Sequence, residues 1–142
     1  MEPALLGLVI DSSVLIAAER VQRTAAQAME SVQKIIGELP VALSALTVAE
    51  VAHGIHRANT PEIRERRRLF LDEQKANVPI YPVTEATTEI IARVGAELAA
   101  KGVILPLGDL IIGACALELG YAIGTSNTRD CNRIPGLNIV QL

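Results

Sequence analysis

The chain has 142 residues; half are hydrophobic, 2% are aromatic, and the formal net charge at pH 7 is −3. We therefore expect a single domain over residues 1–142, with a core built from aliphatic side chains. The acidic balance excludes a generic polyanion-binding protein, because such binding arises mainly from basic side chains. An acidic domain can still process nucleic acid where divalent cations neutralise its site.

Cysteine usage and the N-terminal residues bear on the compartment. Cys115 and Cys131 are too far apart in the sequence for a paired metal or redox motif, so we expect free thiols, with Cys115 in the core. The first apolar run has no basic region ahead of it and is too short for a signal peptide or a membrane span. These features predict a cytoplasmic protein that does not enter a membrane.

The first predicted strand is Leu5–Ile10, since a short apolar run rich in β-branched residues suits a strand buried on both faces. Asp11 and the two serines after it are typical of a turn into a helix, because short polar side chains cap backbone N–H groups. Hydrophobic periodicity with Gly and Pro stops predicts helices at 12–37 with a break near 22–24, and at 47–57, 61–76, 84–102 and 105–120. Short apolar segments predict the remaining strands at 41–44, 78–83, 121–125 and 137–140.

Two of these segments have a distinctive composition. The strand at 78–83 contains two prolines and is expected at a sheet edge. The helix at 105–120 is apolar on every side from Leu110 to Leu117, so it is expected to be buried. Strands that alternate with helices indicate βαβ units with right-handed crossovers. The predicted fold class is a three-layer α/β/α sandwich around a central, mostly parallel sheet of four to five strands.

Four carboxylates stand at comparable places in this scheme, after strands or at the start of helices: Asp11, Glu50, Asp109 and Asp130. Each also has a purely structural interpretation. Asp11 and Asp109 can cap the helices that follow them, and Asp130 lies in a polar turn where aspartate is common. Thr47 and Glu50 match a capping box, in which the glutamate reaches back to the Thr47 N–H.

Together, these acids indicate a metal site. The carboxyl ends of parallel strands share one edge of the sheet, so the four carboxylates are expected to converge there. Clustered carboxylates repel one another and persist only where cations occupy the cluster. Oxygen ligands without His or Cys indicate Mg²⁺ or Mn²⁺, and such ions support in-line phosphoryl transfer. The residues alone therefore favour a metal-dependent nuclease or phosphatase.

Four segments carry a family resemblance: VIDSSVLI, SALTVAEVAHGI, PLGDLIIGACALELG and GTSNTRDCNRIPGL. They closely resemble, in order and spacing, the motif blocks of PIN-domain ribonucleases, and most closely the VapC-type toxins of type II toxin–antitoxin systems. The resemblance covers essentially the whole chain and implies a PIN-like fold. It further implies a Mg²⁺- or Mn²⁺-dependent endoribonuclease that cleaves cellular RNA, forms a homodimer and is neutralised by a cognate VapB-like antitoxin.

The resemblance also implies roles for particular residues. Asp11, Glu50, Asp109 and Asp130 would be the metal-binding and catalytic acids. Ser13 would support the first acid, and Thr125 and Asn127 would orient metal-bound water or Asp130. Cys131 departs from the family pattern, because members usually carry Phe after the fourth acid. We expect the smaller side chain to loosen the packing that fixes Asp130.

The basic residues allow two interpretations. Arginines concentrate between Arg57 and Arg68, interrupted by Glu62 and Glu65, and can form a solvated helix face with local Glu–Arg pairs. Alternatively, Arg64, Arg67 and Arg68 contact RNA phosphates or the antitoxin. His53 and His56 lie one helical turn apart without a third ligand, which favours surface or interface positions. The few aromatic residues argue against base stacking as the main way of holding RNA.

Two rival functions remain to be separated from a nuclease. A metal-dependent adhesion module would need Ser where Leu15 stands in the motif after the first strand, so its signature fails. The stronger alternative is a PIN-fold module that binds a partner with weak or no nuclease activity. The presence of all four acids argues against it, and a metal-binding titration would discriminate.

Overall fold

The computed structural model describes residues 5–142 of the chain. Five strands form one parallel sheet in the order β3-β2-β1-β4-β5. The strands are β1 (Leu8–Ile10), β2 (Val41–Ser44), β3 (Ile80–Tyr81), β4 (Ala122–Thr125) and β5 (Ile139–Gln141). The helices are α1 (Ser12–Arg20), α2 (Ala25–Ile36), α3 (Ala45–His56), α4 (Pro61–Asn77), α5 (Glu85–Ala100), α6 (Leu107–Leu119) and α7 (Thr128–Cys131).

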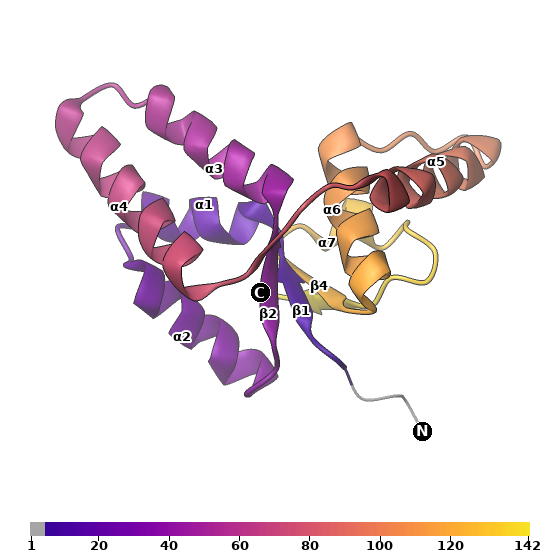
Figure 1. Ribbon diagram of the computed structural model, residues 1–142, viewed down its shortest axis with the longest axis horizontal. Coiled ribbons are helices and arrows are strands. Elements are labelled where there is room, and N and C mark those ends of the chain that lie inside the picture. Colours follow the sequence, from indigo (N-terminus) through magenta and orange to yellow (C-terminus); the bar gives the residue numbers. More distant parts are fainter. Residues whose placement is uncertain (1–4) are drawn as a thin grey trace.

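The sheet lies between two layers of helices, which confirms the predicted α/β/α sandwich. In Figure 1, α1 to α4 lie on one side of the strands and α5 to α7 on the other. Side chains on the central strand β1 alternate between these layers. Leu8 and Ile10 pack into the cluster formed with α1 to α4, whereas Val9 packs against α6. All three are fully buried, because helices cover both faces of the sheet.

Most predicted elements are present, with ends displaced by a few residues. The predicted break near 22–24 is confirmed: α1 ends at Arg20, Gln22 has a positive φ of 61°, and Thr24 caps α2 in a capping box with Gln27. The first strand begins at Leu8 rather than Leu5. Within α6, burial is complete over Ile112–Ala116, and the residues on either side are half-buried.

The joint between β2 and α3 differs from the sequence expectation. The helix begins at Ala45 rather than Thr47, because Ser44 at the end of β2 is its N-cap and accepts a hydrogen bond from Leu46 N at 3.2 Å. Thr47 therefore lies inside the first turn, where its buried hydroxyl has no hydrogen-bond partner among the described residues. The capping box of Thr47 and Glu50 is wrong, and Glu50 has no capping role.

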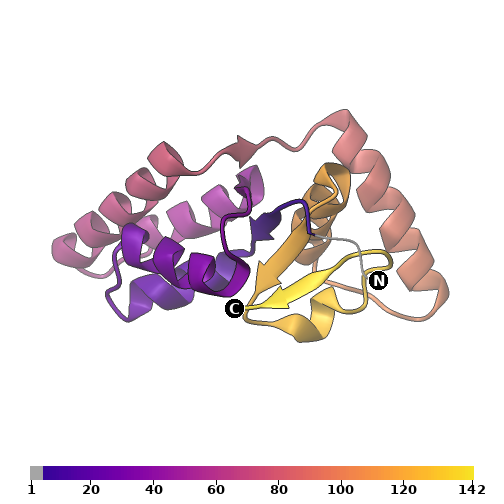
Figure 2. The same ribbon diagram turned by 90° about the horizontal axis from the view of Figure 1, so that it is seen from below.

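The strand β3 lies at the edge of the sheet, as its two flanking prolines predicted. Figure 2 shows that the segment from α4 through β3 to α5 carries the chain from one helical layer to the other. Across residues 5–142, every helix is too short or too polar to span a bilayer.

Candidate active site

The carboxyl ends of three neighbouring strands bring polar residues to one edge of the sheet. Asp11 follows β1 directly, Ser44 ends β2 and Thr125 ends β4. Because the strands are parallel, these residues lie at the same edge of the sheet, where α1 and α3 also begin. This edge is the place that the sequence predicted for the acids.

Asp11 is held by hydroxyl groups rather than by the helix that follows it. It occupies the N-cap position of α1, but its side chain makes no capping hydrogen bond. Its Oδ2 atom instead accepts hydrogen bonds from Ser13 Oγ at 2.7 Å and from Thr125 Oγ1 at 2.9 Å. With 7% of its surface exposed, Asp11 is buried and fixed in orientation. The capping interpretation of its side chain therefore fails.

The loop after β4 is tied to the same carboxylate. Thr125 is fully buried, and its hydroxyl accepts a hydrogen bond from Asn127 N at 3.0 Å while it donates to Asp11. Ser126 N donates to Ser13 Oγ at 3.4 Å. The role expected for Thr125 concerned Asp130 or water, whereas its contact is with Asp11. Asn127 contributes its backbone, and its side chain forms no hydrogen bond with other residues of the 5–142 range.

Glu50 on α3 and Asp109 on α6 are both affected by the negative charge of Asp11. Burial raises the pKa of Glu50, the negative charges of Asp11 and Asp109 raise it further, and a hydrogen bond from Ser12 opposes them. Burial also raises the pKa of Asp109, with Asp11 and Asp130 adding to the effect. The negative charge of Asp11 therefore makes ionisation of both Glu50 and Asp109 less favourable.

Gly108, in the first turn of α6, lies close to the Glu50 and Leu46 side chains of α3. A Cβ atom placed on Gly108 would lie 4.0 Å from Glu50 Oε1 and 3.6 Å from Leu46 Cδ2, which is ordinary van der Waals contact. Asp109 follows as the third residue of α6, whose N-cap is Pro106. Asp109 is therefore not the cap of α6, and it stands in the first turn, where the helix dipole favours a negative charge.

Asp130 is the third residue of the short helix α7, and its neighbour Cys131 joins the core. Cys131 is 4% exposed and packs in the cluster that contains Val9 and Ile112. Burial raises the pKa of the Cys131 thiol to about 11, and the carboxylates of three aspartates contribute: Asp11, Asp109 and Asp130. The residue that replaces the usual Phe is thus a buried, neutral thiol. Both cysteines are free, and Cys115 is buried, as predicted; burial of Cys131 was not predicted.

The four acids share the sheet edge without forming a closed cage. Within residues 5–142, no three His, Cys, Asp or Glu side chains lie close enough together to hold one ion. The predicted convergence is therefore partial, and mutual repulsion between carboxylates is a sufficient physical reason. Their chemistry still fits a hard divalent cation, since all four groups offer oxygen and Asp11 uses only Oδ2 in its hydrogen bonds to Ser13 and Thr125.

Comparison with known proteins identifies the family of this chain. The family model of the PIN domain matches residues 8–137. The chain belongs to the PIN-domain family. This confirms the resemblance inferred from the four sequence segments, and the parallel sheet between helical layers confirms the expected fold.

Curated and solved relatives of this PIN domain cover nearly its whole length. It is 29% identical over 135 residues to Ribonuclease VapC1 of Rickettsia felis, which covers 95% of this chain and 96% of that protein. It is 27% identical over 135 residues to Ribonuclease VapC of Rickettsia bellii, with the same coverage. Among solved structures, VapBC-5 of Mycobacterium tuberculosis aligns with a TM-score of 0.76 and 27% identity over 99% of this chain and 100% of that one. VapBC2 of Rickettsia felis, bound to a promoter DNA fragment, aligns with a TM-score of 0.82 and 19% identity over 95% and 98%.

The arginines of the PIN domain's helix α4 are largely engaged within the molecule. Arg67 Nε lies 3.3 Å from Glu19 Oε2, and Arg67 Nη1 donates to Gly54 O at 2.6 Å. Arg66 Nε donates to Glu19 Oε1 at 3.0 Å. Arg64 donates to Ala58 O at 3.4 Å, and Arg68 forms the local Glu–Arg pair with Glu65 at 4.0 Å. The suggested RNA or antitoxin contact through Arg64, Arg67 and Arg68 stays a prediction. Of the three, Arg67 already contacts Glu19 and Gly54 within the molecule.

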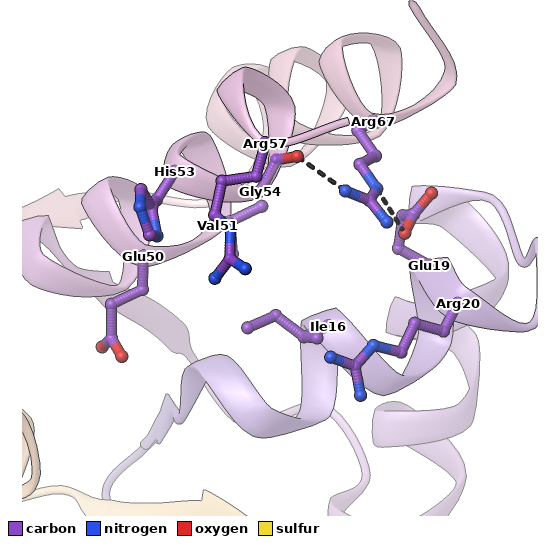
Figure 3. A pocket seen from close by; sticks show the side chains of 9 residues that line it. All are labelled: Ile16, Glu19, Arg20, Glu50, Val51, His53, Gly54, Arg57 and Arg67. Carbon is purple, nitrogen blue, oxygen red and sulfur yellow. Dashed lines mark hydrogen bonds and ion pairs between the residues drawn. The ribbon is translucent and has the colours of Figure 1, made fainter. Parts of the chain in front are cut away.

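Two residues of interest escaped the sequence reasoning. Glu19, in the last turn of α1, is 6% exposed and pairs with α4. Arg20 lies beside a pocket of about 350 Å³ that adjoins Glu50 (Figure 3). No motif marks either residue, because their surroundings are created only when α1 packs against α3 and α4. His53 and His56 are exposed, as favoured, and His53 lines this pocket.

Proposed function

We propose that this PIN domain is a divalent-metal-dependent endoribonuclease and the toxin of a toxin–antitoxin pair. The observation that carries the proposal is the Asp11 carboxylate, which two hydroxyls fix at the sheet edge among three further acids. Family membership supports it, as do the relatives named Ribonuclease VapC that span 95% of the chain.

The residues of the proposed site have two different roles. Ser13 and Thr125 stabilise the ionised form of Asp11, because both donate hydrogen bonds to one of its oxygens. Glu50, Asp109 and Asp130 supply further oxygen ligands from α3, α6 and α7. Bound Mg²⁺ or Mn²⁺ would supply Lewis-acid activation of the scissile phosphate and of the attacking water. The protein's contribution is the fixed position of its charges, which makes catalysis electrostatic.

The raised pKa values of Glu50 and Asp109 are consistent with a role as metal ligands. Without a cation, burial and like charge make both carboxyl groups retain protons more readily. A divalent cation at the sheet edge reverses this preference, since it attracts the charged form. Cation binding at this edge is therefore expected to release protons.

We further propose a cognate antitoxin as the partner of this chain, because several solved relatives are complexes named VapBC. A homodimer, a cytoplasmic location and a single domain over residues 1–142 complete the proposal. The alternative function, a partner-binding module with weak or no nuclease activity, is favoured by one observation: no three acids of the described residues are gathered for one ion. Calorimetric titration with Mg²⁺ separates the two, since the alternative predicts no saturable metal binding.

Mapping RNA 5′ ends after induction of the protein without its antitoxin tests the proposal. We expect discrete cuts with the wild type and a loss of about a thousandfold or more with Asp11→Asn, because a carboxylate central to the chemistry is removed while its shape is kept. Asp72→Asn is the matched control, since Asp72 is exposed on α4. Equal cutting by purified Asp11→Asn protein, free of contaminating nuclease, would refute the assignment.

A further inference from the structure

A basic pocket lies between α1 and α3 at the side of the acidic residues. Its volume is about 350 Å³, and Glu50 forms part of its wall. Figure 3 shows the Arg20 and Arg57 side chains extending into this space from the two helices, with Ile16 between them. The remaining lining residues are Glu19, Val51, His53, Gly54 and Arg67.

The charges around the pocket leave a local positive excess. Glu19 contributes a carboxylate to the wall, but Arg66 and Arg67 neutralise it at 3.0 and 3.3 Å. Arg20 and Arg57 form no ion pair with any residue in the described range. Among the lining residues, Arg20, Arg57 and Arg67 together carry one positive charge more than Glu19 and Glu50, in a chain whose net charge is −3.

The pocket adjoins the acidic site, because Glu50 belongs to both. Helix α1 starts directly after Asp11 and carries Arg20 in its last turn. Helix α3 carries Glu50, and Arg57 follows seven residues later, which corresponds to about 10 Å along a helix. An RNA strand has a phosphate at every nucleotide, so a strand with one phosphate at the acids must place the next charges nearby.

We propose that this pocket binds a phosphodiester group of the RNA strand next to the scissile one, with Arg20 and Arg57 as its anion-binding residues. The inference rests on the proposed function. Guanidinium groups suit phosphate oxygens, since their N–H donors form a planar fork. Four carboxylates at the cleavage site repel RNA, and two arginines beside them provide a local attraction that the chain as a whole lacks. With so few aromatic residues, the contact is to the backbone and is independent of sequence.

The salt dependence of RNA binding tests this pocket separately from cleavage. The probe is a fluorescein-labelled single-stranded RNA of mixed sequence, and the protein carries Asp11→Asn so that the RNA stays intact. In this background, Arg20→Gln and Arg57→Gln should each weaken binding and lower the slope of log affinity against log salt by about 0.7. The double variant should lower it by about twice that amount.

Matched controls separate charge from folding. Arg57→Lys should retain the slope, because the positive charge stays, and Arg93→Gln should also retain it, because Arg93 is exposed on α5 in the other layer. Thermal melting coincident with the parent protein shows that each variant is folded. An unchanged slope for folded Arg20→Gln and Arg57→Gln overturns the inference, and so does a loss restricted to antitoxin binding, which would assign the pocket to a protein carboxylate.

The two proposals fail in different ways. If the wild type cuts RNA but the slopes do not change, the pocket assignment alone is wrong. If the slopes fall as expected but the wild type cuts no RNA, the pocket stands as an RNA site and the proposed nuclease function is wrong.

Discussion

Helix α1 has a buried carboxylate at each end, and the two have opposite surroundings. Asp11 before its first residue and Glu19 in its last turn are 7% and 6% exposed. Glu19 is compensated by two arginines of α4, whereas Asp11 has two neutral hydroxyl donors and acts on the carboxyl groups of Glu50 and Asp109. Burial alone therefore does not distinguish the proposed active-site acid from a structural one. The difference lies in whether the fold itself supplies the opposite charge.

Removal of the Glu19 charge tests whether Glu19 is a structural acid, and it has the largest expected effect on stability. Glu19→Gln leaves Arg66 and Arg67 without their partner, and we expect a loss of about 2 to 3 kcal/mol in the free energy of unfolding. Urea denaturation followed by circular dichroism measures it. Glu30→Gln is the control, because its pair with Lys34 at 3.7 Å is exposed and should contribute less than about 0.5 kcal/mol.

The comparison requires that Asp11→Asn behave differently in the same assay. Because Asp11 has no cationic partner among residues 5–142, its variant should remain within about 1 kcal/mol of the wild type. A loss as large as that of Glu19→Gln would show that Asp11 is a structural acid too.

Removal of one hydroxyl from Asp11 tests the functional half. Thr125→Val keeps the shape of a fully buried side chain and deletes the donor at 2.9 Å from Asp11 Oδ2. We expect RNA cleavage to fall by about 10-fold or more and the Mg²⁺ requirement to rise, since supporting hydrogen bonds orient metal ligands. Cleavage rates across a Mg²⁺ series measure both effects.

Thr47→Val is the matched control for that change. Thr47 is equally buried, but its hydroxyl has no hydrogen-bond partner in the described part of the chain. Its replacement should leave cleavage unaltered and raise stability by up to about 1 kcal/mol. If both valine variants lose cleavage equally, the contact of Thr125 with Asp11 has no special role.

The smallest effect concerns pH. The pKa values of Glu50 and Asp109 are raised from 4.5 and 3.8, so the folded protein binds protons at a higher pH than the unfolded chain. Without divalent cations, their contribution to stability therefore decreases as pH rises through the raised pKa values, and it is most favourable toward acid pH. Thermal melting of the wild type and of Glu50→Gln in chelator should show a weaker decline in the variant. The control Glu97→Gln, exposed on α5, should follow the wild type.

The sequence was sufficient for the fold and for the edge on which the acids lie. Hydrophobic periodicity and turn residues depend on local chemistry, which explains why the break before Thr24 and the edge position of β3 were predicted. The helix start at Ala45 was missed, because Ser44 and Thr47 are both good caps and tertiary burial of Thr47 decided between them.

Side-chain partners that are distant in sequence were beyond prediction. Thr125 and Asp11 are 114 residues apart, and their hydrogen bond depends on the pairing of β1 with β4. The same holds for Glu19 with Arg67, which made an apparently free basic helix face into part of the internal packing. The motif resemblance predicted which acids lie at the sheet edge. Only the packing of the helices shows which charged side chains have no ion-pair partner.

The connections around the sheet edge differ in length, and this has a mechanical consequence. Asp11 alone separates β1 from α1, and no residue separates β2 from α3, so Asp11 and the start of the helix that carries Glu50 are tied directly to the sheet. Asp109 is fixed in turn by the buried middle of α6. Asp130 stands on a helix of four residues between irregular segments. Three of the acids therefore stand on elements tied to the sheet or to the buried core, and we expect any adjustment of the proposed metal site to occur at Asp130.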